Sequence, residues 1–314
     1  MIEIENLSKV YDGRAVVDDL SFRCEAGEVL GFLGPNGAGK STTMKMITGF
    51  VTPSGGRISV CGHDVETDAI AARRAIGYLP EGAPSYPDMT PETFLGFIAD
   101  VRGLRGEARE QRLRKVIAEL HLQPVMQQSI DTLSKGFKRR VGLAQAILHD
   151  PDVLILDEPT DGLDPNQKHE VRELIRSMSR DKLIVISTHI LEEVEAVCSR
   201  AIIIAAGRIL ADDTPQALAA RSRYHNAVRL TLADADTYDK ALAALSSADG
   251  IGGTETDRER LTITALPGDG GAANSTWQDV SGMARDNDWN VASLQLEAGR
   301  LDEVFRTITG GADA

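Results

Sequence analysis

Residues 34–42 have the sequence Gly-Pro-Asn-Gly-Ala-Gly-Lys-Ser-Thr, in which a lysine and two hydroxyl residues end a glycine-rich segment. Such a segment can bind phosphate groups, because its glycines let successive backbone N–H groups point at phosphate oxygens. We expect the Lys40 side chain to reach the β- and γ-phosphates of a nucleotide and the Ser41 hydroxyl to bind Mg²⁺. The complete pattern disfavours the alternative, a glycine-rich turn without a ligand. The predicted nucleotide-binding residues of this P-loop are Gly34, Pro35, Asn36, Gly37, Ala38, Gly39, Lys40, Ser41 and Thr42.

Two acidic residues, Asp157 and Glu158, directly follow the apolar run of residues 153–156. An aspartate at the carboxyl end of a buried strand is expected to hold Mg²⁺ through a water molecule. Glu158 is then placed to polarise an attacking water as a general base. A solvated acidic loop is the alternative interpretation. The strong apolar run before the pair and Pro159 after it favour a functional pair.

A histidine, His189, follows the next apolar run, residues 183–187. In open α/β sheets, ligands bind at the carboxyl ends of the strands. We therefore predict that His189 contacts the γ-phosphate and orients the attacking water, although a lone histidine elsewhere is more often structural. The predicted catalytic residues are thus Lys40, Glu158 and His189.

These side chains need a sheet that brings the ends of several strands together. A short apolar run at residues 29–33 precedes the P-loop, and apolar residues at helical spacing follow it. Residues 90–149 have a helical pattern that begins at Thr90 with a hydroxyl cap and a proline in the first turn. Strands that alternate with helices predict a mostly parallel sheet covered on both faces. The predicted fold class is therefore α/β, with an inserted helical subdomain at about residues 90–150.

The character of the chain changes near residue 225. Alternating apolar residues predict strands, and helical spacing predicts helices between them. The predicted strands are residues 228–232, 261–264 and 291–296, and the predicted helices lie near residues 236–247, 275–287 and 301–309. We predict a nucleotide-binding domain at residues 1–222 and a small α+β domain at residues 223–314, for which a split βαβ arrangement is plausible. This second domain contains no catalytic constellation in its sequence.

Composition limits the classes of function. A length of 314 residues favours two domains, and a formal net charge of −13 argues against a general nucleic-acid binder, which needs a basic face. No run approaches the 18 or so apolar residues of a membrane-spanning helix. The first residues have no basic segment followed by an apolar one, so no secretory signal is expected. The three cysteines form no CxxC motif, which is consistent with a reducing cytosol.

Together these motifs resemble the nucleotide-binding subunit of ABC transporters, over residues 1 to about 220. Leu133-Ser134-Lys135-Gly136 resembles the ABC signature and lies 23 residues before Asp157, counted from Ser134 (157 − 134). Residues 161–164 resemble the D-loop, Glu81 falls at the Q-loop position and Tyr11 at the aromatic A-loop position. Within the family, the chain is most similar to ATPases of two-subunit exporters, including the gliding-motility type and the copper- or drug-efflux type. The resemblance implies that the following residues also contact nucleotide or metal: Tyr11, Glu81, Leu133, Ser134, Lys135, Gly136 and Asp164.

Tyr11 illustrates what the resemblance adds. From spacing alone, a half-buried strand tyrosine is the better interpretation of this residue. At the A-loop position, however, its ring is expected to stack on the adenine base.

The chain departs from the family pattern at two places. The signature usually reads Leu-Ser-Gly-Gly-Gln, and here Lys135 and Phe137 replace its third and fifth residues. Ser134 and Gly136, which the resemblance turns toward a partner's γ-phosphate, are retained. Lys135 either adds positive charge there or points to solvent. Glu81 replaces the usual glutamine and can still reach Mg²⁺ as an oxygen ligand.

The resemblance implies a mechanism. One chain carries one P-loop and one signature, so two chains are expected to form a head-to-tail homodimer that sandwiches two ATP molecules. ATP binding would close the dimer and hydrolysis would reopen it. A separate transmembrane permease subunit is expected to dock between residues 82–89 and the helical region at about 91–115. The expected location is cytoplasmic, peripheral on the inner face of the cell membrane.

Two other functions remain open from the sequence. The first is a soluble ABC-type ATPase that acts on ribosomes or nucleic acid. A single ATPase core, the lack of a long coiled coil and the acidic C-terminal region weigh against it. The second is a nucleotide-sensing regulator with little hydrolysis, and the presence of Glu158 and His189 weighs against that.

Overall fold

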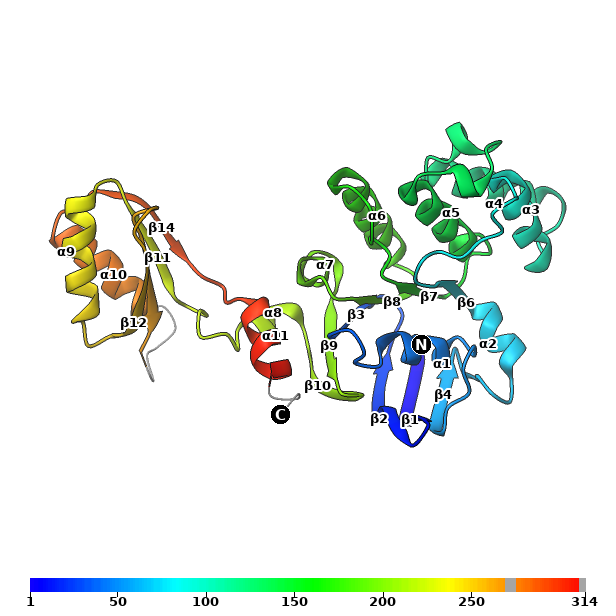
Figure 1. The fold of residues 1–314 in the computed structure, drawn as a ribbon, viewed down its shortest axis with the longest axis horizontal. Coiled ribbons are helices and arrows are strands. Elements are labelled where there is room, and N and C mark those ends of the chain that lie inside the picture. The colour runs from blue at the N-terminus through cyan, green and yellow to red at the C-terminus, as the bar shows by residue number, and fades with distance from the viewer. Residues whose placement is uncertain (269–274, 311–314) are drawn as a thin grey trace. The chain divides into compact units, whose positions relative to one another are not determined.

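The computed structural model describes residues 1–268 and 275–310 and divides into two compact units. Within the described residues, the first unit consists of Met1–Thr214 with Thr309 and Gly310, and the second of the segment Pro215–Ile308 (Figure 1). The predicted boundary was residue 222, and the structure divides the chain after Thr214. No helix in the described part of the chain is long and apolar enough to cross a membrane.

A six-stranded sheet forms the centre of the first unit, in the order β10-β9-β3-β8-β7-β6. Five strands are parallel, and only β10 runs antiparallel to its neighbour β9. The strands are β3 (Val29–Leu33), β6 (Ile76–Leu79), β7 (Val153–Asp157), β8 (Leu183–Thr188), β9 (Arg200–Ala205) and β10 (Arg208–Asp213). Every residue of β3, β7 and β8 is buried, as expected for strands covered on both faces. The predicted parallel sheet is therefore confirmed.

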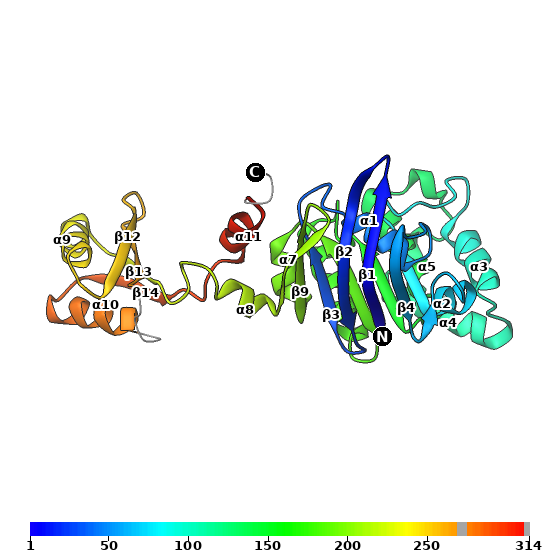
Figure 2. The same cartoon turned by 90° about the horizontal axis from the view of Figure 1, so that it is seen from below.

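A second, antiparallel sheet has the order β2-β1-β4-β5, and Figure 2 shows its three longer strands side by side. Its strands are β1 (Ile2–Tyr11), β2 (Arg14–Cys24), β4 (Gly55–Val60) and β5 (His63–Asp64). Helix α1 (Lys40–Ile47) contacts strands of both sheets, and its Met44, Met46 and Ile47 belong to their shared core. Each such buried side chain contributes about 1.5–3 kcal/mol, so the helix that follows the P-loop is firmly held.

The helical region lies to one side of the sheets in Figure 1. Its helices are α3 (Pro91–Val101), α4 (Gly106–Glu119) and α5 (Lys135–Ile147), with short 3₁₀ turns at Gln123–Val125 and Ile130–Thr132. Thr90 caps α3 by accepting a hydrogen bond from the Thr93 amide, which confirms the predicted helix start. The remaining helices of this unit are α2 (Ala69–Ala75), α6 (Pro165–Met178) and α7 (Leu191–Val197).

The second unit contains a four-stranded antiparallel sheet in the order β12-β13-β11-β14. With α9 and α10 packed against the sheet, this is the split βαβ arrangement that was judged plausible. Its elements are α8 (Pro215–Ala219), β11 (Val228–Leu232), α9 (Ala235–Ser246), β12 (Ile251–Asp257), β13 (Thr262–Pro267), α10 (Ser275–Asp286), β14 (Val291–Leu296) and α11 (Leu301–Gly310). The sequence pattern does not indicate β12, because two glycines and a single large apolar residue leave no alternation of apolar and polar side chains.

Candidate functional site

The P-loop joins β3 to α1, and its glycines are required by the backbone. A Cβ atom on Gly34 would lie 2.3 Å from the Ile204 carbonyl oxygen, and one on Gly39 would lie 2.7 Å from the Val16 carbonyl oxygen. Gly37 and Gly39 also have φ angles of +82° and +104°, in the left-handed region that favours glycine. The glycines therefore let the loop backbone lie close to Ile204 and Val16, and they add no side chain that would cover the backbone N–H groups.

The Lys40 side chain is buried and folds back over the loop. Its ammonium group donates to the carbonyl oxygens of Gly34 at 2.7 Å and Pro35 at 3.0 Å. Burial lowers the pKa of Lys40, while the negative charges of Glu158 and Asp157 act in the opposite direction. The ammonium group is thus held beside the loop by neutral carbonyl groups, which a phosphate oxygen can replace as a stronger, charged acceptor.

Asp157 ends β7 and is 1% exposed. Its Oδ1 atom accepts a hydrogen bond from the Ser187 hydroxyl, and its Oδ2 atom has no hydrogen-bond partner among the described residues. A buried carboxylate oxygen without a partner is costly, so this atom is suited to a water or ion that the protein must bind.

Ser41, Glu81 and Glu158 line one pocket of about 310 Å³ with Lys40 and the glycines of the loop. A hydroxyl group and carboxylate oxygens are the donors that Mg²⁺ takes together with phosphate oxygens. No group of three or more His, Cys, Asp or Glu side chains in the described residues could hold a metal ion by itself. These residues therefore fit a Mg²⁺ ion that arrives with a nucleotide.

Glu158 and His189 are in direct contact. The Nδ1 atom of His189 lies 2.8 Å from Oε1 of Glu158, and the two side chains are 49% and 18% exposed, respectively. Glu158 has a φ of +50°, which is uncommon for a residue with a side chain. Its amide donates to the Ser187 carbonyl oxygen at 3.0 Å. The fold thus places side by side two residues predicted at neighbouring strand ends. Glu158 lines the pocket that contains Lys40, and His189 is not among the described lining residues.

Arg139 holds the backbone of this segment, and sequence reasoning missed it. Its guanidinium group is 5% exposed and donates to the carbonyl oxygens of Asp157, at 3.2 Å, and Glu158. It also donates to the Pro80 carbonyl oxygen at 3.4 Å, just before Glu81. Burial lowers the pKa of Arg139. The available signal was its place on the buried face of α5, three residues after Gly136.

Tyr11 ends β1 and is 45% exposed. This exposure fits a half-buried strand tyrosine as well as a ring that receives an adenine base, so the A-loop role stays a prediction. Lys9 lies over the ring, with its Nζ atom 5.0 Å from the ring centroid. Tyr11 pairs with Arg14, and Val16, two residues further along β2, lines the P-loop pocket.

The signature segment begins helix α5. Ser134 caps the helix by accepting a hydrogen bond from the Phe137 amide at 3.3 Å, and Leu133 before it is buried. A Cβ atom on Gly136 would lie 2.5 Å from the Oε1 atom of Gln167, the end of a flexible side chain on α6. Among the described residues that line the P-loop pocket, none comes from positions 133–136. The signature of a chain therefore does not complete the P-loop pocket of the same chain.

The Lys135 side chain is 68% exposed, in line with the alternative that it points to solvent. Its Nζ atom pairs with Oδ2 of Asp161 at 3.0 Å, and its aliphatic chain lies against Gly162. This pairing is the main cause that lowers the pKa of Asp161. Asp164, at the end of the same loop, caps α6 by accepting from the Gln167 amide at 2.9 Å. The signature and the D-loop are thus linked within one chain.

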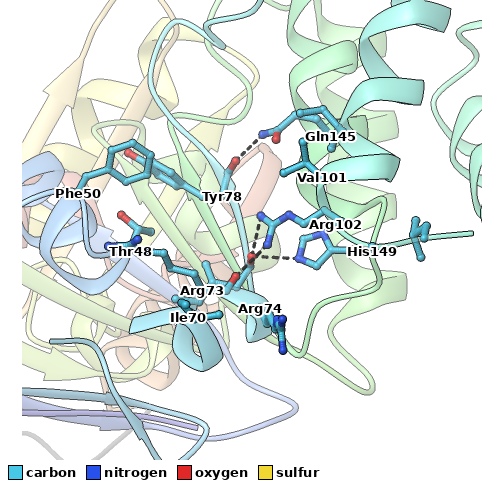
Figure 3. A pocket seen from close by; sticks show the side chains of 14 residues that line it. Thr48, Phe50, Ile70, Arg73, Arg74, Tyr78, Val101, Arg102, Gln145 and His149 are labelled. Atoms are coloured by element: carbon cyan, nitrogen blue, oxygen red, sulfur yellow. Dashed lines mark hydrogen bonds between the residues drawn. The ribbon is translucent and has the colours of Figure 1, made fainter. Parts of the chain in front are cut away.

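A separate groove of about 700 Å³ lies between α2, β6, α3 and α5 (Figure 3). It exposes Phe50, Ile70 and Val101, whose relative exposures are 73%, 69% and 65%. Figure 3 shows hydrogen bonds that fix polar groups of the groove, including His149 to the Ile76 carbonyl oxygen at 3.1 Å. Ile98 and residues 101–104 of the predicted docking region contribute to the lining, whereas residues 82–89 do not.

Comparison with known proteins identifies relatives of both units. The family model described as "ABC transporter" matches residues 17–161. The Nod factor export ATP-binding protein I of Burkholderia pseudomallei (strain 1710b) is 41% identical over 218 residues, which cover 69% of this chain and 72% of that protein. The linearmycin resistance ATP-binding protein LnrL of Bacillus subtilis (strain 168) is 32% identical over 313 residues, which cover 99% of this chain and 98% of that protein. The similarity to LnrL therefore extends through the C-terminal unit.

A solved structure shows the same fold for the first unit. It is a dimeric, post-hydrolysis state of the ATP-binding cassette MJ0796 bound to ADP and Pi. The similarity has a TM-score of 0.64 and covers 68% of this chain and 99% of that chain, at 21% sequence identity. At this identity the comparison establishes the fold, and the P-loop and strand-end residues described above lie within that fold.

Proposed function

This chain belongs to the family of ABC transporter ATP-binding proteins and is an ATPase of that family, and on that premise we propose that it powers an exporter by hydrolysing ATP beside a separate membrane permease. The observation that carries the proposal is the pocket in which Lys40, Ser41 and Glu158 meet next to the unpartnered Oδ2 atom of Asp157. Two relatives support export, because their names refer to Nod factor export and to linearmycin resistance.

The hydrolytic roles follow from the geometry of the pocket. The P-loop amides and Lys40 would bind the phosphates, and Ser41, Asp157 and Glu81 would hold Mg²⁺, which neutralises phosphate charge when it is bound. Glu158 would accept a proton from the attacking water. His189, at 2.8 Å from Glu158, would orient that carboxylate and contact the γ-phosphate.

Tyr11 and Asp164 complete the proposed nucleotide-binding site. The accessible ring of Tyr11 would stack on the base. Asp164 would contact the nucleotide region from the loop that begins α6. Both assignments rest on the family pattern, together with the exposure of the ring and the position of the loop.

A homodimer would place the signature segment of one chain at the P-loop pocket of the other. The N-terminus of α5, with Leu133, Ser134, Lys135 and Gly136, lies outside the P-loop pocket of its own chain. A helix N-terminus favours bound anions, so this segment is suited to the γ-phosphate held by a second copy. Two-fold symmetry would then form two equivalent ATP sites. The dimeric state of the structurally similar cassette supports this arrangement.

The groove of Figure 3 is the proposed docking site of the permease. Its exposed apolar side chains stand beside Arg73 and Arg74, so an amphipathic helix with acidic residues would fit it. Ile98 and residues 101–104 belong to the helical region, so a partner in this groove would contact the subdomain that carries the signature. The chain would then act at the cytoplasmic face of the membrane.

Affinity purification from detergent-solubilised membranes tests the proposal against the ribosomal alternative. The tagged full chain is expected to retain an integral membrane protein, and Ile70→Glu in the exposed groove is expected to abolish that capture. Leu210→Glu, an equal change at a residue of β10 that is 38% exposed, serves as the matched control. Capture of ribosomes in place of a membrane protein, unaffected by Ile70→Glu, would contradict the proposal.

A further inference from the structure

Glu193 is a buried carboxylate that the proposed mechanism does not use. It lies on α7 and is 3% exposed. Its Oε2 atom accepts a hydrogen bond from the Thr188 hydroxyl at 2.9 Å, and its Oε1 atom accepts one from the Thr160 hydroxyl. A carboxylate is rarely buried to this degree unless its oxygens are satisfied, and here both are.

The two threonines belong to the segments that carry the proposed catalytic pair. Thr160 follows Glu158 by two residues in the turn after β7, and Thr188 is the last residue of β8, directly before His189. They are 2% and 1% exposed, respectively. The Glu193 carboxylate therefore connects two segments that are distant in sequence. These segments carry Glu158 and His189, whose side chains contact each other.

The backbone conformation of Glu158 explains why these hydrogen bonds are needed. A φ of +50° is disfavoured for a residue with a Cβ atom, so the surrounding structure must hold it. Arg139 holds the carbonyl oxygen of Glu158 from one side. Glu193 holds the turn at Thr160 from the other side. The Thr188 hydroxyl also accepts from the Ile190 amide at 3.0 Å, which fixes the backbone on both sides of His189.

Two hydroxyl donors converge on Glu193, and this explains the residue type. A carboxylate offers an acceptor oxygen to each donor at once. Glutamine has the same shape but offers one acceptor oxygen, so its NH₂ group would face one of the hydroxyl groups. Alanine would leave both threonine hydroxyls without their acceptor in a buried place.

We propose that Glu193 is a positioning residue that fixes Glu158 and His189 relative to each other by binding Thr160 and Thr188. The inference rests on the catalytic roles proposed above for Glu158 and His189. Glu193 is not among the described residues that line the pocket, and neither are its hydrogen-bond partners Thr160 and Thr188. Its removal should therefore lower turnover and leave ATP binding at the P-loop intact.

The test uses steady-state ATP hydrolysis by the purified full chain. Glu193→Ala should lower kcat by about 10- to 100-fold, the usual effect of a small misplacement of catalytic groups, and should leave KM for ATP within about twofold. Glu193→Gln should recover only part of the loss, because it keeps the shape and one of the two acceptor oxygens. Glu192→Gln is the matched control, because it removes one negative charge from the adjacent, exposed position of the same helix and should leave kcat unchanged.

Two further measurements complete the test, and the first of them can be made even if Glu193→Ala unfolds. Thr160→Val and Thr188→Val each remove one hydrogen-bond donor to Glu193 at constant shape, and each should lower kcat with little change in KM. Thr188→Val also removes the acceptor of the Ile190 amide, so Thr160→Val is the cleaner of the two. In a Glu158→Gln background, Glu193→Ala should change the residual rate by less than about twofold, because the base to be positioned is already absent.

Equal kcat for the parent and for all three single variants would overturn the inference, as would a full additional loss in the Glu158→Gln background. Normal turnover by Glu158→Gln alone would instead overturn the proposed role of Glu158, and the positioning role with it. The two failures are therefore distinguishable.

Discussion

Glu158→Gln is the sharpest test of the proposed chemistry, because the structure isolates the side-chain effect. The backbone of Glu158 is held through its amide by the Ser187 carbonyl oxygen and through its carbonyl oxygen by Arg139. Glutamine has the same shape, so it should keep the unusual φ of +50° and the contact with His189. The substitution removes the negative charge and the proton acceptor and little else.

Glu158→Gln should change the activation free energy of hydrolysis more than the free energy of unfolding. Replacing the charged hydrogen bond to His189, 2.8 Å long, with a neutral one should lower the free energy of unfolding by about 1 kcal/mol. Loss of a general base should lower turnover by roughly 10²- to 10⁴-fold, which corresponds to about 3–5 kcal/mol in the activation free energy. The effect on the barrier therefore exceeds the effect on stability, and the folded variant should bind ATP without turning it over.

The assay measures phosphate release at saturating ATP and, in parallel, molecular mass by light scattering with and without ATP and Mg²⁺. The variant should release phosphate at the predicted low rate and accumulate as a dimer in ATP, since the closed state no longer reopens by hydrolysis. Glu192→Gln should behave like the parent chain. A turnover within threefold of the parent, in a variant that folds normally, would refute the assignment of Glu158 as general base.

Other substitutions test the remaining parts of the site. Lys40→Ala removes charge-assisted contacts of about 1.5–3 kcal/mol, so calorimetry should show ATP binding weakened by about 10- to 100-fold. Ser134→Arg should abolish ATP-dependent dimerisation in light scattering while the monomer still binds ATP. Lys135→Ala should lower the free energy of unfolding by less than about 1 kcal/mol, because its pair with Asp161 is exposed, and NMR titration should show the Asp161 pKa rising. Burial lowers the pKa of His149 from 6.5 to about 4. The unfolded chain is therefore protonated first, and the free energy of unfolding should fall as pH drops from about 6.5 to about 4. His149→Gln should lack this component in denaturant titrations at each pH.

The parts of the fold that the sequence predicted are those with strong local patterns. Residues 29–33 and 153–156 are short apolar runs that end in polar, functional segments, and both are buried strands of the parallel sheet. The P-loop between β3 and α1 is defined by glycines that the backbone requires for conformation and close approach. Local pattern was sufficient for these elements, because local conformation and burial both depend on residues adjacent in sequence.

The side chains that the sequence did not reveal act across long separations. Arg139 on α5 contacts the ends of β6 and β7, and Glu193 on α7 contacts the ends of β7 and β8. In the sequence, each is one of several charged residues on its helix, and nothing distinguishes it from the others. Their partners are backbone carbonyls and threonine hydroxyls, which have no distinctive motif. Only the packing of these helices against the sheet makes the contacts visible.

The same helix connects the two halves of the proposed ATP site. Ser134, at the start of α5, would face the nucleotide of a second copy, and Arg139 on the next turn holds the carbonyl oxygen of Glu158 in its own chain. Lys135 adds a second link, through Asp161, to the turn that follows Glu158. Because these contacts lie within one turn and a half of a rigid helix, a shift of α5 on engaging the partner's phosphate would move the general base of its own pocket. Closure of one ATP site would thereby change the position of Glu158 in the other site. This gives a physical reason for the two ATP molecules to be hydrolysed by a dimer and not by independent subunits.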